Sequence, residues 1–251
     1  MAANFIYKNI FEQKRMGCNS STTASSPGAA GGKKGIVPGT VKYSYFDVGY
    51  GRADPLEQMF SHHGQPHEKD SHALGAPTVP KSEFGGGLPQ IIGKVGGKDV
   101  HYGQFAAMMR TFGIRYGYYD PKNWKLARYT DPIVDTWGDL IGAFGAVAFN
   151  QDESKKQELV EKWIAVATRF MAFVEKNMAH HGGKFAAGNQ VTIADFVLCS
   201  FFGNFVKNPK NPTSPMLLPL LDPNPKLKAY AMSIETNFPH LKNRGEQQYP
   251  M

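Results

Sequence analysis

The stretch VKYSYFDVGYGRADPLEQMF, residues 41–60, decides how this 251-residue chain is organised. Its first part alternates, so that Tyr43 and Tyr45 share one face of an extended segment, which is the period of a β-strand. Two glycines then supply a turn, and Asp54 and Pro55 are residue types favoured in a first helical turn. The stretch therefore predicts a strand, a turn and a helix, with Tyr45 facing a helix N-terminus, where thiolates and other anions bind well.

The next segments predict a hairpin and a second helix. Residues 88–94 and 99–102 flank central glycines that suit a hairpin turn. Proline fits poorly inside a central strand unless its peptide bond is cis or its amide faces outward, which makes Pro89 a special position. Residues 104–112 predict a helix that ends at Gly113.

Between these elements, the prolines and histidines of residues 64–84 predict a loop. His62, His63, His67 and His72 could suggest a metal site, but no cysteine or acidic ligand joins them at a recognised spacing. The sequence favours exposed loop histidines, and we expect no metal.

The second half of the chain is predicted to be helical. Apolar residues recur at helical spacing over residues 133–144 and 159–174, and we expect their aromatic residues to lie in the core. Thr192 and Asp195 predict a capping box with a structural role, in which each side chain bonds to a backbone amide at the start of a helix. The density of prolines in residues 207–225 predicts an ordered loop without a helix.

The composition limits the possible partners. No run approaches the ~18 apolar residues of a membrane span. The net charge of +7 would suit an acidic partner, RNA or a membrane surface, but the lysines are scattered and no helix carries a basic stripe. We therefore expect neither a nucleic-acid partner nor a membrane span. Two cysteines, Cys18 and Cys199, predict a reducing compartment and no structural disulfide.

The N-terminal extension is predicted to lie outside any core. Residues 17–40 are rich in Gly, Ser, Thr, Ala and Pro and are typical of a linker. The residues before them could form a weak mitochondrial transit peptide, or a tail held by a partner surface. Residues 16–21 match an acylation pattern, which would require Met16 to be an alternative start, with Gly17 and Cys18 as the acylated residues.

Motifs in both halves of the chain share one resemblance. They are Tyr45-Phe46, Gly51-Arg52-Ala53-Asp54-Pro55, Leu88-Pro89, Gly96-Gly97-Lys98, the Thr-x-Ala-Asp segment of residues 192–195, and residues 238–242. Together they resemble the cytosolic glutathione transferases of the sigma, mu and related tyrosine classes. This resemblance implies a thioredoxin-like α/β domain at residues 41–119, packed on an all-helical domain at residues 120–251, after an extension at residues 1–40.

The resemblance also implies a glutathione site with Tyr45 as its catalytic residue. A hydroxyl that donates a hydrogen bond to the thiolate lowers the pKa of the thiol. Alternatively, Tyr45 is a packed strand tyrosine like Tyr43. The residues that the resemblance implies in glutathione binding are Arg52, Lys81, Gly87, Leu88, Pro89, Gln104 and Phe105; of these, Leu88 would pair with the cysteinyl backbone and Lys81 would reach the glycyl carboxylate.

Three positions depart from the pattern of that family. Phe105 replaces a serine whose hydroxyl holds the γ-glutamyl carboxylate, and losing one hydrogen bond to a charged group costs ~1.5–3 kcal/mol. A tryptophan of the preceding loop is absent, since no tryptophan precedes Trp124. Gly87 replaces a polar residue before the proline. The catalytic tyrosine is kept, while the glutathione cradle is eroded.

Two functions follow from this sequence. The first is an active glutathione transferase, a homodimer that joins glutathione to a small hydrophobic electrophile or isomerises a lipid peroxide. The second is a transferase-fold structural subunit of a larger assembly, anchored by its N-terminal extension, with weak or no catalysis. The default localisation is cytoplasmic, with a mitochondrial or ciliary assembly as the alternative.

Overall fold

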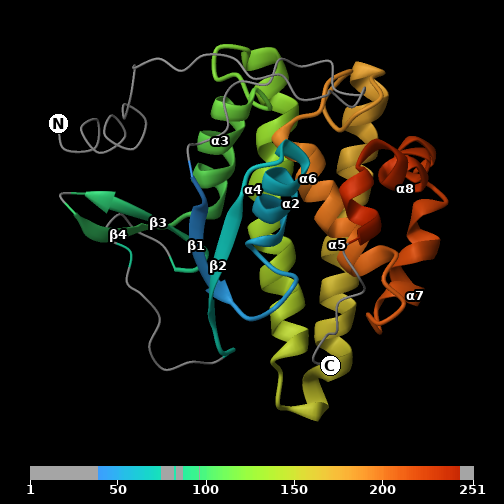
Figure 1. The fold of residues 1–251 in the computed structure, drawn as a ribbon. Helices are drawn as coiled ribbons and strands as arrows, with labels where there is room; N and C mark the ends of the chain where they lie inside the picture. Colours follow the sequence, from blue (N-terminus) through green and yellow to red (C-terminus); the bar gives the residue numbers. More distant parts are fainter. Residues whose placement is uncertain (1–38, 75–81, 83–86, 96, 244–251) are drawn as a thin grey trace.

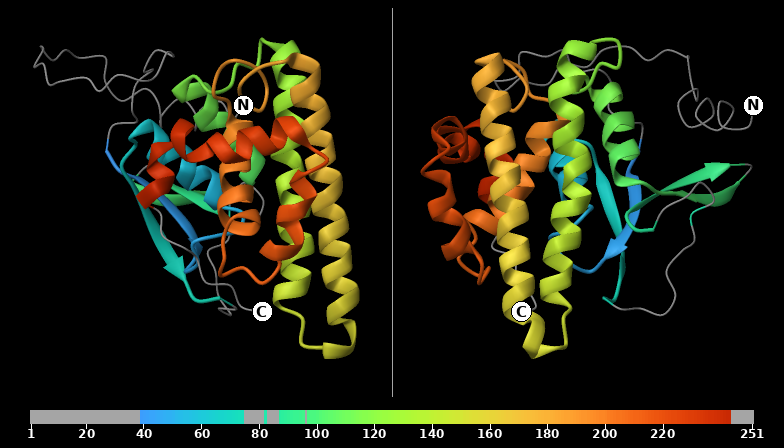
Figure 2. Two further views of the ribbon diagram at one scale, coloured as in Figure 1. Left: turned by 90° about the vertical axis from the view of Figure 1, so that its right-hand side faces the viewer. Right: turned by 180° about the vertical axis from the view of Figure 1, so that it is seen from behind.

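A computed structural model describes residues 39–74, 82, 87–95 and 97–243 of the chain (Figure 1). The expectations for the N-terminal extension, for Lys81 and for Gly96 lie outside the described residues. In the first half of the described chain, a small mixed sheet carries two helices. In the second half, helices predominate (Figure 2).

The sheet has four strands in the order β2-β1-β3-β4. Strand β1 pairs parallel with β2 and antiparallel with β3, and β3 and β4 form an antiparallel hairpin. Helix α2 connects β1 to β2, and helix α3 follows β4. The bounds are β1 (Val41–Phe46), α2 (Asp54–His63), β2 (His67–His72), β3 (Gln90–Val95), β4 (Lys98–Tyr102) and α3 (Phe105–Tyr116).

The β1–α2 unit forms as the sequence predicts. Strand β1 buries Tyr43 and Tyr45, and helix α2 begins with Asp54 and a proline in its first turn. Its inward face is fully buried and packs between the sheet and helix α6, as Figure 1 shows. Gly64, in the left-handed conformation, ends the helix, because its φ of 75° is open to glycine without steric cost.

Strand β2 was not predicted from the sequence. Residues 67–72, HEKDSH, were expected to be a loop, and the four histidines at positions 62, 63, 67 and 72 were expected to be exposed on it. Both expectations were wrong: His62 and His63 belong to α2, the other two belong to β2, and all four are half-buried. Strand β2 lies at the sheet edge and is held by backbone pairing with β1 from Val41 to Phe46. It therefore forms without the apolar alternation by which a strand is predicted from sequence.

Helix α3 also runs further than predicted. It continues through Gly113 to Tyr116 and ends at Gly117, whose φ is 83°. Gly113 has a packing role, because a Cβ at this position would overlap Ile193 at the start of α6. The glycine therefore lets α3 approach α6 closely and does not stop the helix.

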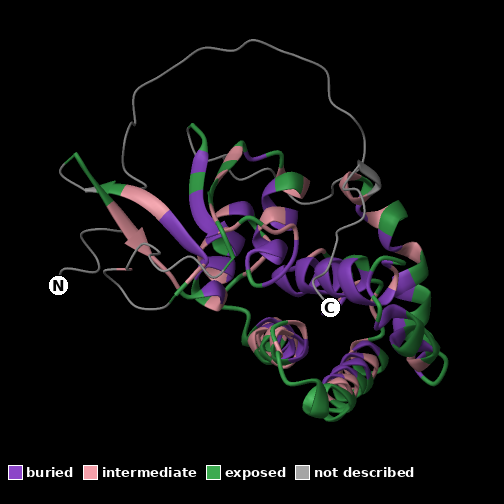
Figure 3. Ribbon diagram, turned by 90° about the horizontal axis from the view of Figure 1, so that it is seen from below, coloured by how far each residue is buried: buried purple, intermediate pink, exposed green. Residues whose placement is uncertain are grey.

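The helical half is built on a long antiparallel pair, α4 (Trp124–Ala148) and α5 (Lys156–His181), visible from behind in Figure 2. Helix α6 (Ile193–Phe201) is buried at every residue, and Figure 3 shows this core between the sheet and the helix pair. The proline-rich segment was expected to lack helix, and this was wrong: it contains the short helix α7 and the 3-10 helix η3, each with a proline in its first turn, where a missing N–H costs nothing. The remaining elements are η1 (Glu153–Lys155), the π-helix η2 (Phe202–Val206), α7 (Ser214–Leu217), η3 (Leu218–Leu221), α8 (Pro225–Asn237) and η4 (Pro239–Asn243).

The aromatic core of the helical half matches the prediction from helical spacing. Trp137 and Trp163 are fully buried, and Phe205 of η2 lies 6.0 and 5.2 Å from their rings. Over the described residues, no helix is both long enough and apolar enough to cross a membrane.

Candidate functional site

Tyr45 lies at the end of β1, where the chain turns into α2. Its hydroxyl accepts a hydrogen bond from the backbone N–H of Arg52, 2.8 Å away. Gly51, with a φ of 97°, makes this approach possible, because a Cβ at that position would overlap the tyrosine oxygen. The turn between strand and helix is therefore shaped around the hydroxyl of Tyr45.

The proton of this hydroxyl has no acceptor among the residues that the structure describes. Burial raises the pKa of Tyr45 to about 12, and the hydrogen bond from Arg52 offsets this only in part. The group is therefore protonated at neutral pH and is able to donate. Tyr43 on the same strand face differs, because its hydroxyl already donates to Glu57 Oε1 at 2.6 Å.

Pro89 directly precedes strand β3, which pairs with the strand of Tyr45. Antiparallel pairing joins Ser44 to Gln90, and extending this register by one residue brings Pro89 opposite Tyr45. The Leu88–Pro89 peptide bond is cis, as one of the two sequence-based alternatives allowed. Leu88 is half-buried, and Gly87 is exposed with open space where a side chain would be.

Two helices that border this region begin without a side-chain cap. Helix α2 starts after Ala53 and helix α3 after Gln104, and neither residue caps its helix. Gln104 has a φ of 74° and a ψ of 95°, a conformation that costs a non-glycine residue about 1–3 kcal/mol and that occurs mostly at functional sites. Uncapped helix N-termini can offer backbone N–H groups and a positive dipole end to an anion. At α2, however, Asp54 N already donates to Gly51 O and Leu56 N to Ala53 O, so this argument applies to the start of α3.

Phe105 provides no side-chain donor for an anion at the start of α3. Its ring is buried in the core at 8% exposure, so no side-chain donor stands at the first position of α3. The side chain of Arg52 is exposed, whereas Lys81 lies outside the described residues. A hollow of about 140 Å³ adjoins the start of α3, lined by Tyr102, Gly103, Gln104, Ala107, Met108, Thr111 and Phe112.

A buried polar bridge holds the turn from the helical half, and little in the sequence predicts it. Asn204 of η2 donates to Asp54 Oδ2 at 2.7 Å, and Gln58 donates to Asp54 Oδ1 at 3.1 Å. Gln58 in turn contacts His240, whose Nε2 lies 2.9 Å from Gln58 Oε1. The only sequence signal for Asn204 is a polar residue inside the apolar run FFGNFV.

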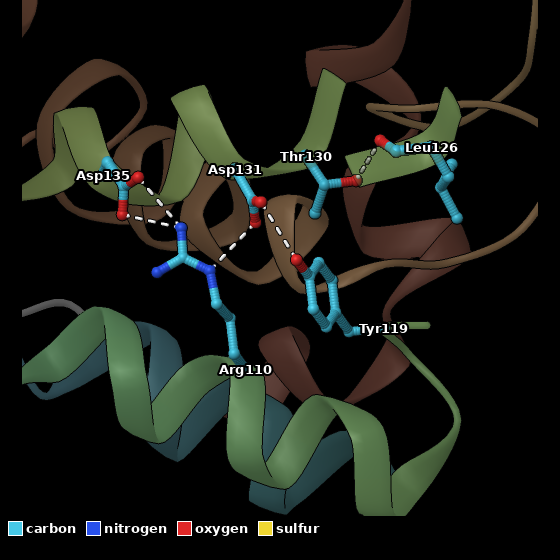
Figure 4. Close-up of polar contacts among 6 residues, drawn as sticks. All are labelled: Arg110, Tyr119, Leu126, Thr130, Asp131 and Asp135. Atoms are coloured by element: carbon cyan, nitrogen blue, oxygen red, sulfur yellow. Dashed lines mark hydrogen bonds and ion pairs between the residues drawn. The ribbon is translucent and has the colours of Figure 1, made fainter. Parts of the chain in front are cut away.

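A second link ties α3 to α4. The guanidinium of Arg110 donates to Asp131 at 3.0 Å and to both oxygens of Asp135 at 2.9 Å, and Tyr119 donates to the other oxygen of Asp131 (Figure 4). Together with the Asp54 bridge, this link fixes the helical half against both helices that border the Tyr45 turn.

The predicted capping box at α6 is present and complete. The carboxylate of Asp195 accepts hydrogen bonds from Thr192 N, Thr192 Oγ1, Ala186 N and Tyr230 Oη, all within 2.8–2.9 Å. Burial raises the pKa of Asp195, and these four bonds oppose that effect. No atom of the carboxylate is left for a ligand. In the described part of the chain, no group of three or more His, Cys, Asp or Glu residues could hold a metal ion.

Comparison with known proteins supports one fold. Residues 138–243 match the family described as glutathione S-transferase, C-terminal domain. Three solved structures resemble this one: the monomeric glutathione S-transferase Na-GST-3 of Necator americanus (24% identity, 81% of this chain and 95% of that one, TM-score 0.62), prostaglandin synthase D of Nilaparvata lugens (22%, 82% and 96%, 0.61), and the glutathione S-transferase of Ascaris lumbricoides (21%, 82% and 95%, 0.60). A search of curated protein sequences found no significant match.

Proposed function

We propose that this chain, which has the glutathione S-transferase fold and through residues 138–243 the C-terminal domain of that family, binds glutathione and activates its thiol with Tyr45. The observation that carries the proposal is the hydroxyl of Tyr45, whose lone pair is held by Arg52 N while its proton has no acceptor among the described residues. The reaction would join the thiol to a small electrophile or isomerise a lipid peroxide.

The chemistry requires a hydrogen-bond donor. A free thiol has a pKa near 8.5, so most of it is protonated at neutral pH. A hydrogen bond donated to the thiolate favours the charged form and lowers that pKa. Because the pKa of Tyr45 is raised to about 12, its hydroxyl keeps the proton and acts as a donor, not as a base.

The other contacts of the tripeptide are assigned by position. The backbone of Leu88, before the cis proline opposite Tyr45, would pair with the cysteinyl part. The uncapped start of α3 at Gln104 would face a carboxylate, and the exposed guanidinium of Arg52 would lie near the tripeptide. We place Lys81 and Gly87 in the same site, within a glutathione-binding domain at residues 41–119.

A second candidate function is a structural subunit with weak or no catalysis. The observation that favours it is Phe105, which uses the position of a carboxylate-binding hydroxyl for core packing. In that case the transferase fold would serve as a scaffold within a larger assembly. A homodimer and such an assembly both remain predictions.

The test is glutathione binding by calorimetry, together with a conjugation assay on the natural chain and two matched variants. Tyr45→Phe should lose roughly 10²–10³-fold in kcat, the usual effect of removing one donor to a developing anion. Tyr43→Phe is the control on the same strand face, because the proton of Tyr43 goes to Glu57. It should keep its activity.

Two outcomes would contradict the proposal. Equal losses in both variants would assign the effect to strand packing and not to the free proton of Tyr45. An absence of glutathione binding by the natural chain would favour the structural subunit.

A further inference from the structure

The end of the helix pair where α4 begins and α5 ends carries an exposed aromatic and basic surface. Trp124 is 64% exposed, and the two other tryptophans of the chain are fully buried. Lys125 Nζ lies 5.9 Å and Arg128 Cζ 6.0 Å from the centre of the Trp124 ring. Figures 1 and 2 show both helix ends at one edge of the molecule. A large apolar ring is thus exposed to solvent with two cations close to it.

Folding brings the basic end of α5 to the same place. Tyr129 of α4 bonds to His180 Nδ1 through its hydroxyl and stacks edge-on with His181. Three residues after His181, exposed Lys184 lies over the ring of Phe185, with its Nζ 5.2 Å from the ring centre. We call Trp124, Lys125, Arg128, Tyr129, His180 and Lys184 the Trp124 surface.

The charge of this surface is of one sign. Residues 121–130 contain three basic residues and no acidic one, and residues 176–189 contain two lysines and no acidic residue. The carboxylates that flank these segments in sequence have other partners: Asp131 binds Arg110, Asp120 accepts from Lys122 N, and Glu175 accepts from Leu227 N. The α4–α5 pair therefore brings basic residues from two separate segments to one end of the molecule.

Helix stability does not explain this choice of residues. Acidic residues stabilise the first turn of a helix, and α4 has none there. An exposed tryptophan likewise contributes little to folding and exposes apolar area to water. The Trp124 surface instead combines cations, which attract anionic groups, with an exposed ring, which can enter an apolar environment.

We propose that the Trp124 surface docks the protein on anionic phospholipid membranes. Tryptophan prefers the interface between headgroups and acyl chains, and lysine and arginine near it are attracted to anionic headgroups. A ring that projects from a helix end suits a bilayer, which yields around it, better than a preformed protein surface. This inference does not depend on the proposed catalysis.

The experiment uses the intrinsic fluorescence of the full chain. Because Trp137 and Trp163 are fully buried, a shift of emission on vesicle binding reports Trp124. With vesicles of phosphatidylcholine and phosphatidylserine we expect a blue shift and protection from a soluble quencher. Phosphatidylcholine alone should give neither, and high salt should reverse both, because exposed charges are screened.

Two matched double variants locate the surface. Each cation near an anionic bilayer contributes about fivefold in affinity, so the reversal of two, K125E with R128E, should weaken vesicle binding at least about twentyfold. K155E with K156E makes the same charge change at the opposite end of the helix pair, where both lysines are exposed, and should keep most of the binding. Trp124→Ala should weaken binding in a sedimentation assay, which needs no fluorescence.

Three results would overturn the proposal. Equal losses in the two double variants would mean that only the net charge matters. Vesicle binding without a Trp124 shift would assign it to another segment. A shift with polyglutamate but not with vesicles would identify an acidic protein partner instead.

Discussion

The starts of helices α2 and α6 are built in opposite ways. At α6, Thr192 and Asp195 satisfy each other, and the carboxylate accepts four hydrogen bonds. At α2, Ala53 provides no cap, and nearby Tyr45 keeps a proton that no described residue accepts. Both places are buried, so the difference is not one of exposure.

This difference separates stability from reactivity. Buried polar groups are normally paired, because an unpaired one costs free energy. A site that must bind a ligand has to leave such a group unpaired until the ligand arrives. The closed α6 start is therefore a folding element, and the hydroxyl of Tyr45, beside the uncapped start of α2, marks the candidate site.

The largest expected effect is at the closed start. Asp195→Ala would leave four donors without their acceptor inside the core, and we expect a loss of about 4 kcal/mol in the free energy of unfolding. Chemical denaturation measures this loss. Asp152→Ala, which removes an exposed carboxylate at the start of η1, should cost at most about 1 kcal/mol. Similar losses in the two variants would remove the contrast.

The next effect sharpens the comparison at the start of α3. Phe105→Ser should cost about 3 kcal/mol of stability, because a buried ring is lost, and should strengthen glutathione binding about tenfold to a hundredfold by adding a hydroxyl. Phe105→Ala loses the same ring without gaining a donor. If both variants bind glutathione equally, the start of α3 does not hold the carboxylate.

A smaller effect is expected at the uncapped start of α2. Gly51→Ala combines a positive φ with overlap of the Tyr45 hydroxyl, which should cost about 2–3 kcal/mol and displace the donor. Gly64→Ala has a similar φ and open space around it, and should cost only about 1 kcal/mol with activity retained. Unchanged conjugation by Gly51→Ala would show that the activity does not depend on the position of the Tyr45 hydroxyl set by this turn.

The smallest effect concerns the C-terminal end of α2, where the side chain of His62 is packed against other rings. Burial lowers the pKa of His62, whose ring contacts Phe238 and His240. The folded state therefore prefers the neutral ring, and the unfolded state binds more protons below about pH 6.5. Denaturation midpoints should fall as the pH drops through this range, and His62→Gln should flatten the decline. A midpoint that rises on acidification would contradict the assignment.

Elements governed by local pattern could be predicted from the sequence. The alternation of β1, the proline of α2 and the Thr192–Asp195 spacing each carry their own physical signal, and each element formed as expected. Resemblance to a family supplied the arrangement of the two halves. The same resemblance implied the catalytic role of Tyr45, which stays a prediction.

Features governed by tertiary contact could not be predicted in this way. Strand β2 has no apolar face that a sequence pattern could reveal. It forms because its backbone pairs with β1. Gly113 looks like a helix stop in sequence, but its role is to admit Ile193. The bridge of Asn204 and the Trp124 surface each join segments that are distant in sequence, and a local sequence pattern does not predict such contacts.

The bridge from Asn204 to Asp54 has a consequence for the order of assembly during synthesis. The two residues are 150 positions apart, and the contact between Gln58 and His240 spans 182. A growing chain emerges from the ribosome with its N-terminal part first, so the Tyr45 turn leaves long before the residues that hold it. The sheet can form early, but the Tyr45 turn acquires its final support only when the chain has been made as far as His240. A nascent chain is thus kept from presenting a finished site before its helical half has folded.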